Sequence, residues 1–169
     1  MIRTVLDSLY NWSGYLAAFF LAAIGLAVIA QIVGRFIGVT IEGTELAGFC
    51  LAATSFFALA HTFKSGSHVR VNLLVRRFTG SAGRLVEIWC CGASAVIVGY
   101  AAWFAILLTV QSYQFNDISP GLLAMPFWIP QAGMAAGLAL LTVALVDEMI
   151  LVARGREPSY EAAIDRALD

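Results

Sequence analysis

Two histidines and three cysteines are the side chains of this sequence that could supply the nitrogen and sulfur ligands of a haem or a zinc ion. His61 and His68 lie seven residues apart in one segment, whereas a membrane haem needs axial ligands on its opposite sides, usually from different helices. Cys50, Cys90 and Cys91 lie inside apolar runs and lack the spacing of a zinc site. The pattern therefore predicts no catalytic residue, no metal site, no cofactor and no disulfide framework.

His61 has a second interpretation, because an ionisable residue inside an apolar helix often marks a functional site. The structural alternative is that His61 simply reaches the polar boundary of its helix, since Lys64 follows within one helical turn. Both interpretations stay open on the sequence alone.

Three charged residues, Arg35, Glu42 and Glu45, flank the short connection between the first two apolar runs. Thr44 and Glu45 make a favourable helix start, because an acid is stabilised at the positive end of the helix dipole. Arg35 complements the C-terminal end of the preceding helix in the same way. The functional alternative is that these charges pair with another membrane subunit.

Apolar helices are the elements that must position these side chains. Hydrophobic residues make up 60% of the chain and charged residues 12%, whereas soluble domains carry about 25% charged residues. Charged residues bound four apolar stretches, each long enough for the roughly 20 residues that cross a bilayer core of about 30 Å. We expect an all-α integral membrane protein with four transmembrane helices near residues 12–34, 45–63, 87–113 and 128–151.

One membrane domain over residues 1–153 leaves 154–169 as a short cytoplasmic tail. The apolar run that ends at Gly34 is far longer than the roughly 7–15 residues of a signal-peptide core, so the first span is expected to be retained. No segment has the basic character of a nucleic-acid-binding region.

The distribution of lysine and arginine predicts the orientation. Nine of the ten lie in the N-terminus, in the 64–87 loop or in the C-terminal tail, and Arg35 is the exception. Because cytoplasmic loops carry an excess of Lys and Arg, both termini are predicted to be cytoplasmic.

The 64–87 loop contains a helical pattern of apolar residues, with Val71, Leu74, Val75 and Phe78 on one face. This pattern predicts a short basic helix between the second and third spans, lying in the membrane interface against anionic lipid. The alternative is an ordinary positive loop. The polar residues of this segment fall largely elsewhere and include Arg70, Asn72, Arg76 and Arg77.

The fourth span is expected to begin near Trp128, after a proline-rich connection, because proline is tolerated in the first turn of a helix but not in its interior. Trp128 would then lie at the periplasmic interface. Within this span, Gly133 and Gly137 form a small-xxx-small pair that favours close packing between helices.

None of the four spans has a charged residue at its middle. A transporter that couples an ion or proton by itself is expected to have one there, together with repeats or broken helices. The residues therefore favour an auxiliary membrane subunit. An autonomous small homodimeric transporter, a structural subunit of another complex and a haem or enzyme subunit remain as alternatives.

Residues 57–64 (FALAHTFK) and 67–74 (SHVRVNLL) resemble one family, the small membrane subunit, or Q subunit, of tripartite ATP-independent periplasmic (TRAP) transporters. Arg35 with the Glu42–Glu45 segment also fits, as does the Ser119–Pro130 segment with its tryptophan. The resemblance covers about residues 5–150. One departure is Asn72, where the family more often has an acid.

The resemblance implies a bacterial inner-membrane complex in which a periplasmic binding protein delivers an organic acid, such as a C4-dicarboxylate or sialic acid. A large membrane subunit then moves the acid inward with sodium, while the small subunit acts as a scaffold and binds no substrate. Its partners would be the large subunit, the binding protein and membrane lipids, with no nucleic acid. Candidate residues facing a partner or lipid are Arg35, Glu42, Glu45, Lys64, His68, Arg70, Asn72, Arg76, Arg77 and Trp128.

Overall fold

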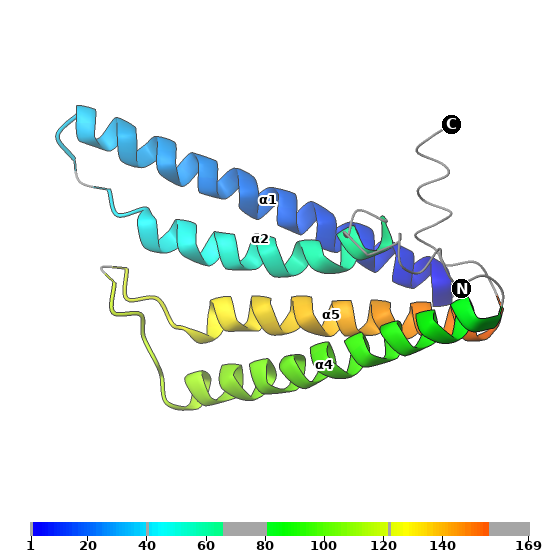
Figure 1. Ribbon diagram of the computed structural model, residues 1–169. Helices are drawn as coiled ribbons and strands as arrows, with labels where there is room; N and C mark the ends of the chain where they lie inside the picture. The colour runs from blue at the N-terminus through cyan, green and yellow to red at the C-terminus, as the bar shows by residue number, and fades with distance from the viewer. Residues whose placement is uncertain (1, 40, 66–80, 122, 156–169) are drawn as a thin grey trace, which may run out of the picture.

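Four long helices make up the fold (Figure 1). The structure, a computed structural model, describes residues 2–39, 41–65, 81–121 and 123–155. Across these ranges the named elements are helices only, and the 115–127 connection adds an isolated antiparallel bridge between Ile118 and Pro126. The helices are α1 (Ile2–Phe36), α2 (Thr44–Lys64), α4 (Ser81–Gln114) and α5 (Trp128–Ala153).

Each of the four helices is long and apolar enough to cross a membrane, so the expected all-α architecture with four such helices is confirmed. α1 and α4 are longer than the spans expected from the apolar runs, since α1 begins at Ile2 and α4 begins at Ser81. A helix continues through polar residues at the edge of a bilayer because its backbone hydrogen bonds do not depend on the apolar run. The expected interfacial helix falls within residues 66–80, which lie outside the described residues.

The helices pack side by side in the order α1, α2, α5, α4, which differs from their order along the chain (Figure 1). The principal contacts join α1 with α2, α2 with α5, and α5 with α4. α2 and α5 are therefore adjacent, and they run in the same direction. The start of α1 and the end of α5 lie at one end of the molecule, which is called here the terminal end. The 37–43 and 115–127 connections lie at the opposite end, called here the loop end.

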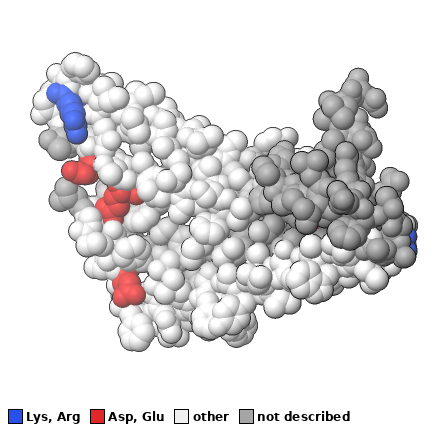
Figure 2. Space-filling view, viewed as in Figure 1, with Lys and Arg blue, Asp and Glu red and all other residues white. Residues whose placement is uncertain are grey.

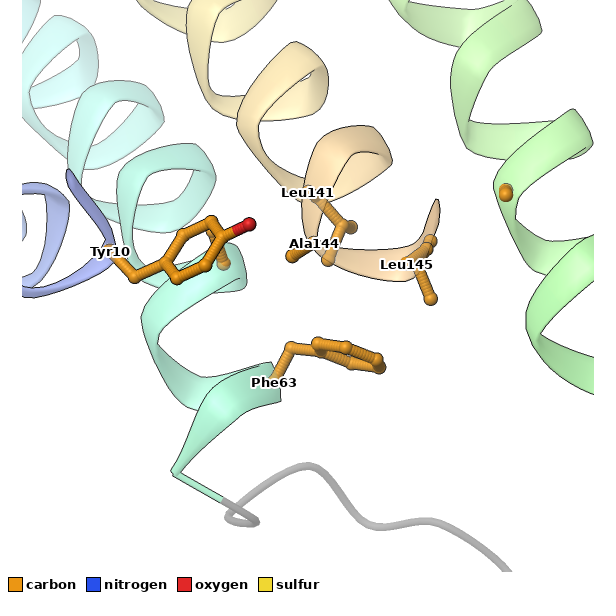
Figure 3. Close-up of a cluster of buried hydrophobic side chains, with 7 residues drawn as sticks. Tyr10, Phe63, Leu141, Ala144 and Leu145 are labelled. Atoms are coloured by element: carbon orange, nitrogen blue, oxygen red, sulfur yellow. The ribbon is translucent and has the colours of Figure 1, made fainter. Parts of the chain in front are cut away.

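The core lies toward the terminal end and joins all four helices (Figure 3). Tyr10 of α1 and Phe63 of α2 point toward Leu141, Ala144 and Leu145 of α5 in this view. Small residues of α4 complete the packing, because buried Cys91, Ala95, Ala102 and Ala105 recur at helical spacing and α4 packs on α5. α5 is the most buried of the four helices and α1 the least, as expected for a row with α5 inside it.

α5 and α2 approach closely at a glycine. A Cβ atom at Gly137 would lie 2.5 Å from the carbonyl carbon and oxygen of Phe56, so only a residue without a side chain fits there. Gly133, one turn earlier, is less constrained, since its nearest neighbour would be the Phe57 ring at 3.7 Å. Of this pair, Gly137 is therefore the residue that permits backbone contact between the two parallel helices.

Candidate functional site

A buried ion cluster joins α2 to α5 near the terminal end. Lys64 Nζ lies 2.7 Å from Asp147 Oδ2 and 3.1 Å from Glu148 Oε2. The Glu148 side chain is fully buried, and those of Lys64 and Asp147 are 12% and 22% exposed. A charge removed from water needs a close partner of opposite charge, because desolvation disfavours the ionised form strongly. The cluster therefore constrains the C-terminal turn of α2 against the last two turns of α5.

Tyr10 extends the ion cluster to α1. Lys64 Nζ lies 5.4 Å from the centroid of the Tyr10 ring, within the range of a cation–π contact. The Tyr10 side chain is 2% exposed, and its hydroxyl has no hydrogen-bond partner among the described residues. Three helices thus meet at one ammonium group.

This ion cluster is not among the features predicted from the sequence, although one signal for it is present there. Asp147 and Glu148 lie inside the expected fourth span, and Lys64 lies at the end of the second span on the same predicted side. Acids that enter an apolar span require a partner, and Lys64 is the basic residue that borders a neighbouring span.

At the loop end, α1 supplies the cap of α2. Gly43 is the N-cap residue and has no side chain to offer. Gln31 of α1, with its amide oxygen turned toward α2, accepts hydrogen bonds from the backbone N–H groups of Gly43 and Thr44, both at 2.8 Å. It also accepts from Thr44 Oγ1 at 3.0 Å. Since the first N–H groups of a helix have no partner within the helix, this side chain fixes where α2 starts.

Glu45 joins the start of α2 to the 115–127 connection. Its Oε2 atom accepts a hydrogen bond from the backbone N–H of Leu123 at 3.2 Å, and its Oε1 atom is buried with no hydrogen-bond partner in the described part of the chain. The connection is itself ordered by backbone hydrogen bonds from Ser119 N–H to Met125 O at 2.9 Å and from Phe127 N–H to Asp117 O at 3.0 Å. Glu45 therefore positions this connection over the N-terminal end of α2.

Replacing Glu45 with leucine is expected to release this connection and to lower the stability of the isolated chain by about 1.5–3 kcal/mol, the usual size of a hydrogen bond to a charged group. Glu45→Gln should lose less, because its amide oxygen can still accept from Leu123. Limited proteolysis within residues 115–127 and thermal unfolding in detergent measure the two effects. Glu42→Gln is the matched control, since Glu42 is exposed, and equal protease resistance of Glu45→Leu and the control would contradict the assigned contact.

The remaining charges of the loop end are open to solvent or to a partner. Arg35 lies in the last turn of α1, and Arg35, Glu42 and Asp117 are all exposed. Figure 2 shows acidic groups and one basic group gathered at this end, whereas the middle of the described surface on this face is uncharged. Trp128, the first residue of α5, packs edge-on against Tyr113 of α4 with ring centroids 5.8 Å apart.

His61 packs against the backbone of α1. A Cβ atom at Gly14 would lie 2.8 Å from His61 Cγ, so the imidazole occupies the space that a side chain at position 14 would need. This contact explains a histidine at that position by packing. In the described ranges, no three His, Cys, Asp or Glu side chains come together in a way that could hold a metal ion. The candidate residues His68, Arg70, Asn72, Arg76 and Arg77 lie outside the described residues.

Four apolar helices, polar clusters confined to their ends and an uncharged middle define a multi-pass membrane protein. A comparison with protein families identifies the kind of membrane protein. Residues 24–155 match the family described as "Tripartite ATP-independent periplasmic transporters, DctQ component", and the chain belongs to this family. It is thus a small permease subunit of a TRAP transporter, a family of transporter components and not of enzymes. No curated protein matches the chain.

Proposed function

We propose that this chain is the stationary scaffold of its transporter, holding the large membrane subunit in place during sodium-driven uptake of an organic acid. A periplasmic binding protein delivers the acid, of which a C4-dicarboxylate or a sialic acid is an example. The observation that carries the proposal is the placement of charge in the described helices. Every charged residue of α1, α2, α4 and α5 lies within about two turns of a helix end, so these four helices have no Asp, Glu, Lys or Arg at mid-membrane.

Packing within the chain supports a scaffold role. The ion cluster and the Gly137 contact join α2 to α5, Gln31 joins α1 to α2, and Glu45 joins α2 to the connection that leads into α5. Links at both ends of the row oppose sliding of one helix past another. A moving subunit needs a partner that resists tilting in the bilayer, and a row of four linked helices widens the footprint of the complex.

We further propose that both termini are cytoplasmic, in the bacterial inner membrane, with 1–153 as the membrane domain and 154–169 as a short tail. Nine of ten Lys and Arg residues support this orientation, as does the shared end for the start of α1 and the end of α5 (Figure 1). The orientation is measured with a cysteine placed at Ile37 and a membrane-impermeant maleimide added to intact cells, which should label that cysteine. Absence of labelling at that cysteine, when the maleimide is added to intact cells, would show the opposite orientation.

The basic segment with Arg70, Arg76 and Arg77 is proposed to bind anionic lipid at the cytoplasmic surface, where each basic residue contributes about 1 kcal/mol. Arg35 and Glu42 are proposed as contacts for a partner subunit at the loop end, because both are exposed. Lys64 and Glu45 face neighbours within the chain, so their contribution to assembly is through the shape of the helix row.

Uptake by reconstituted vesicles tests the function. Vesicles with the binding protein, the large subunit and this chain should accumulate the acid when a sodium gradient is applied. Omitting this chain should reduce uptake to the level of vesicles without the large subunit, and this chain alone should transport nothing. The binding protein's affinity for the acid should be unchanged by any substitution in this chain. Full uptake without the chain, or uptake by the chain alone, would overturn the proposal.

A further inference from the structure

α4 has two unlike faces. The face toward α5 carries small residues, since Cys91, Ala95, Ala102, Ala105 and Ser112 are all buried. The opposite face carries large, exposed residues, at positions 89, 96, 100, 103, 107 and 110. From Val96 onward these positions follow a spacing of four and three residues in turn, which is the spacing of a helix that packs against another helix at about 20°.

Two residues of this face carry polar atoms at the middle of the span. Tyr100 is 68% exposed and Trp103 is 61% exposed, and both lie close to the centre of the candidate span Gly83–Gln114. Neither the Tyr100 hydroxyl nor the Trp103 indole N–H donates to an acceptor in the described residues; the one ring contact of Tyr100 there is with Phe104, at 4.7 Å between centroids. Lipid tails have no acceptors, so these donors would be left unpaired if lipid covered the face.

α1 shows the arrangement that lipid exposure favours. Its exposed Trp12 and Tyr15 lie near the terminal end, where aromatic residues with a polar atom meet the headgroup region. The exposed residues at the centre of α1 include Phe19, Leu21, Leu26 and Val28, which have no polar side-chain atom. The two outer helices of the row therefore differ at mid-membrane: the α4 surface needs hydrogen-bond acceptors, and the α1 surface needs none.

We propose that the face of α4 formed by Val96, Tyr100, Trp103, Leu107 and Val110 packs against a transmembrane helix of the large subunit. That helix presents small residues, which make room for the aromatic rings, and oxygen acceptors opposite Tyr100 and Trp103. The occupant is a protein helix because the polar atoms of Tyr100 and Trp103 need acceptors that lipid tails lack, and the large subunit is chosen because the chain belongs to a family of transporter components. A second copy of this chain fits less well, because it would bring the same large rings together where close helix packing needs small residues. The assignment rests on the proposed function and names the surface that performs it.

Photo-cross-linking in the assembled complex tests the assignment. A benzophenone side chain is placed at Val96 or Leu107 on α4, and at Phe19 or Leu26 on α1 as controls, since Val96, Phe19 and Leu26 are 73%, 67% and 68% exposed. Cross-links to the large subunit are expected from α4 and not from α1. Cross-links from α1 alone, a dimer of this chain from α4, or no cross-link from α4 in a complex that co-purifies would each overturn the assignment. Failure of the unmodified chain to co-purify with the large subunit would instead remove the proposed function on which it rests.

Removal of the two hydrogen-bond donors provides a second measurement. Tyr100→Phe and Trp103→Phe should each weaken association with the large subunit by about threefold, the effect of one hydrogen bond between helices in a membrane. Thermal stability of the isolated chain should change little, because neither donor has a hydrogen-bond partner within the described residues and both residues are largely exposed. Tyr15→Phe on α1 is the matched control and should leave association unchanged. Equal association of the Tyr100→Phe, Trp103→Phe double variant and the wild type would overturn the acceptor assignment.

Discussion

Replacing Lys64 with methionine should destabilise the isolated chain by about 3–5 kcal/mol, the usual effect of removing one partner from a buried ion pair. Methionine has a similar length and keeps the apolar packing, but the two carboxylates lose the ammonium group that lies 2.7 and 3.1 Å from them. Glu148 is affected most, because it is fully buried and its charge has no access to water. The temperature at which the chain loses its monodisperse peak in detergent chromatography measures the loss.

Two variants separate the role of charge from the role of shape at this cluster. Lys64→Arg retains the positive charge and should lose clearly less stability than Lys64→Met. The triple variant Lys64→Met, Asp147→Asn, Glu148→Gln removes all three charges and should recover much of the loss, because neutral side chains cost less to bury than charged ones. A Lys64→Met chain as stable as the wild type would show that the cluster contributes nothing to the packing of α2 on α5.

Introduction of a large side chain at Gly137 should separate α2 from α5. A Cβ atom there already lies 2.5 Å from the Phe56 carbonyl, and backbone atoms cannot rotate away as a side chain can. Gly137→Leu is therefore expected to cost at least the 1–3 kcal/mol typical of overpacking. Gly137→Ala should show a smaller change in the same direction. Thermal unfolding of the purified chain, combined with disulfide cross-linking between cysteines placed on α2 and α5, would measure both.

Gly25→Leu is the matched control for this substitution, since a Cβ atom at Gly25 meets nothing within 4 Å. It exchanges the same residues in another apolar helix, so any general effect of leucine on insertion into the membrane appears in both variants. Equal stability of Gly137→Leu and Gly25→Leu would contradict a close approach of the two helices at Gly137.

These two features explain why α2 and α5 act as one unit in the proposed scaffold. Lys64 and Gly137 lie at different heights along the same helix pair, so one contact fixes the distance between the helices and the other fixes their register. α2 is the shortest and least apolar of the four helices, and it lies between α1 and α5. Its position in the complex therefore depends on its neighbours more than on lipid.

The apolar helices could be predicted from the sequence because they depend on local properties. Length, hydropathy and the position of charges are sufficient to predict that residues such as Phe19 or Leu138 lie in membrane-spanning helices. The resemblance of residues 57–74 to one family was sufficient to predict the class of protein, and the family match over residues 24–155 confirms that prediction. The basic segment at 66–80 and the orientation stay predictions.

The contacts between helices were decided by the tertiary structure alone. Lys64 meets Asp147 across 83 residues of sequence, and Gln31 caps a helix that starts beyond the next connection. Such pairs depend on the order α1, α2, α5, α4 and on the register of each helix. The apolar surfaces of the four helices are similar in composition, so composition alone would allow several orders and registers. The choice among them follows from steric fit at a few positions, such as Gly137 against Phe56, and from the need of each buried charge for a partner. The sequence by itself thus determined four helices and their class, whereas their neighbours and their ion cluster arose from packing in three dimensions.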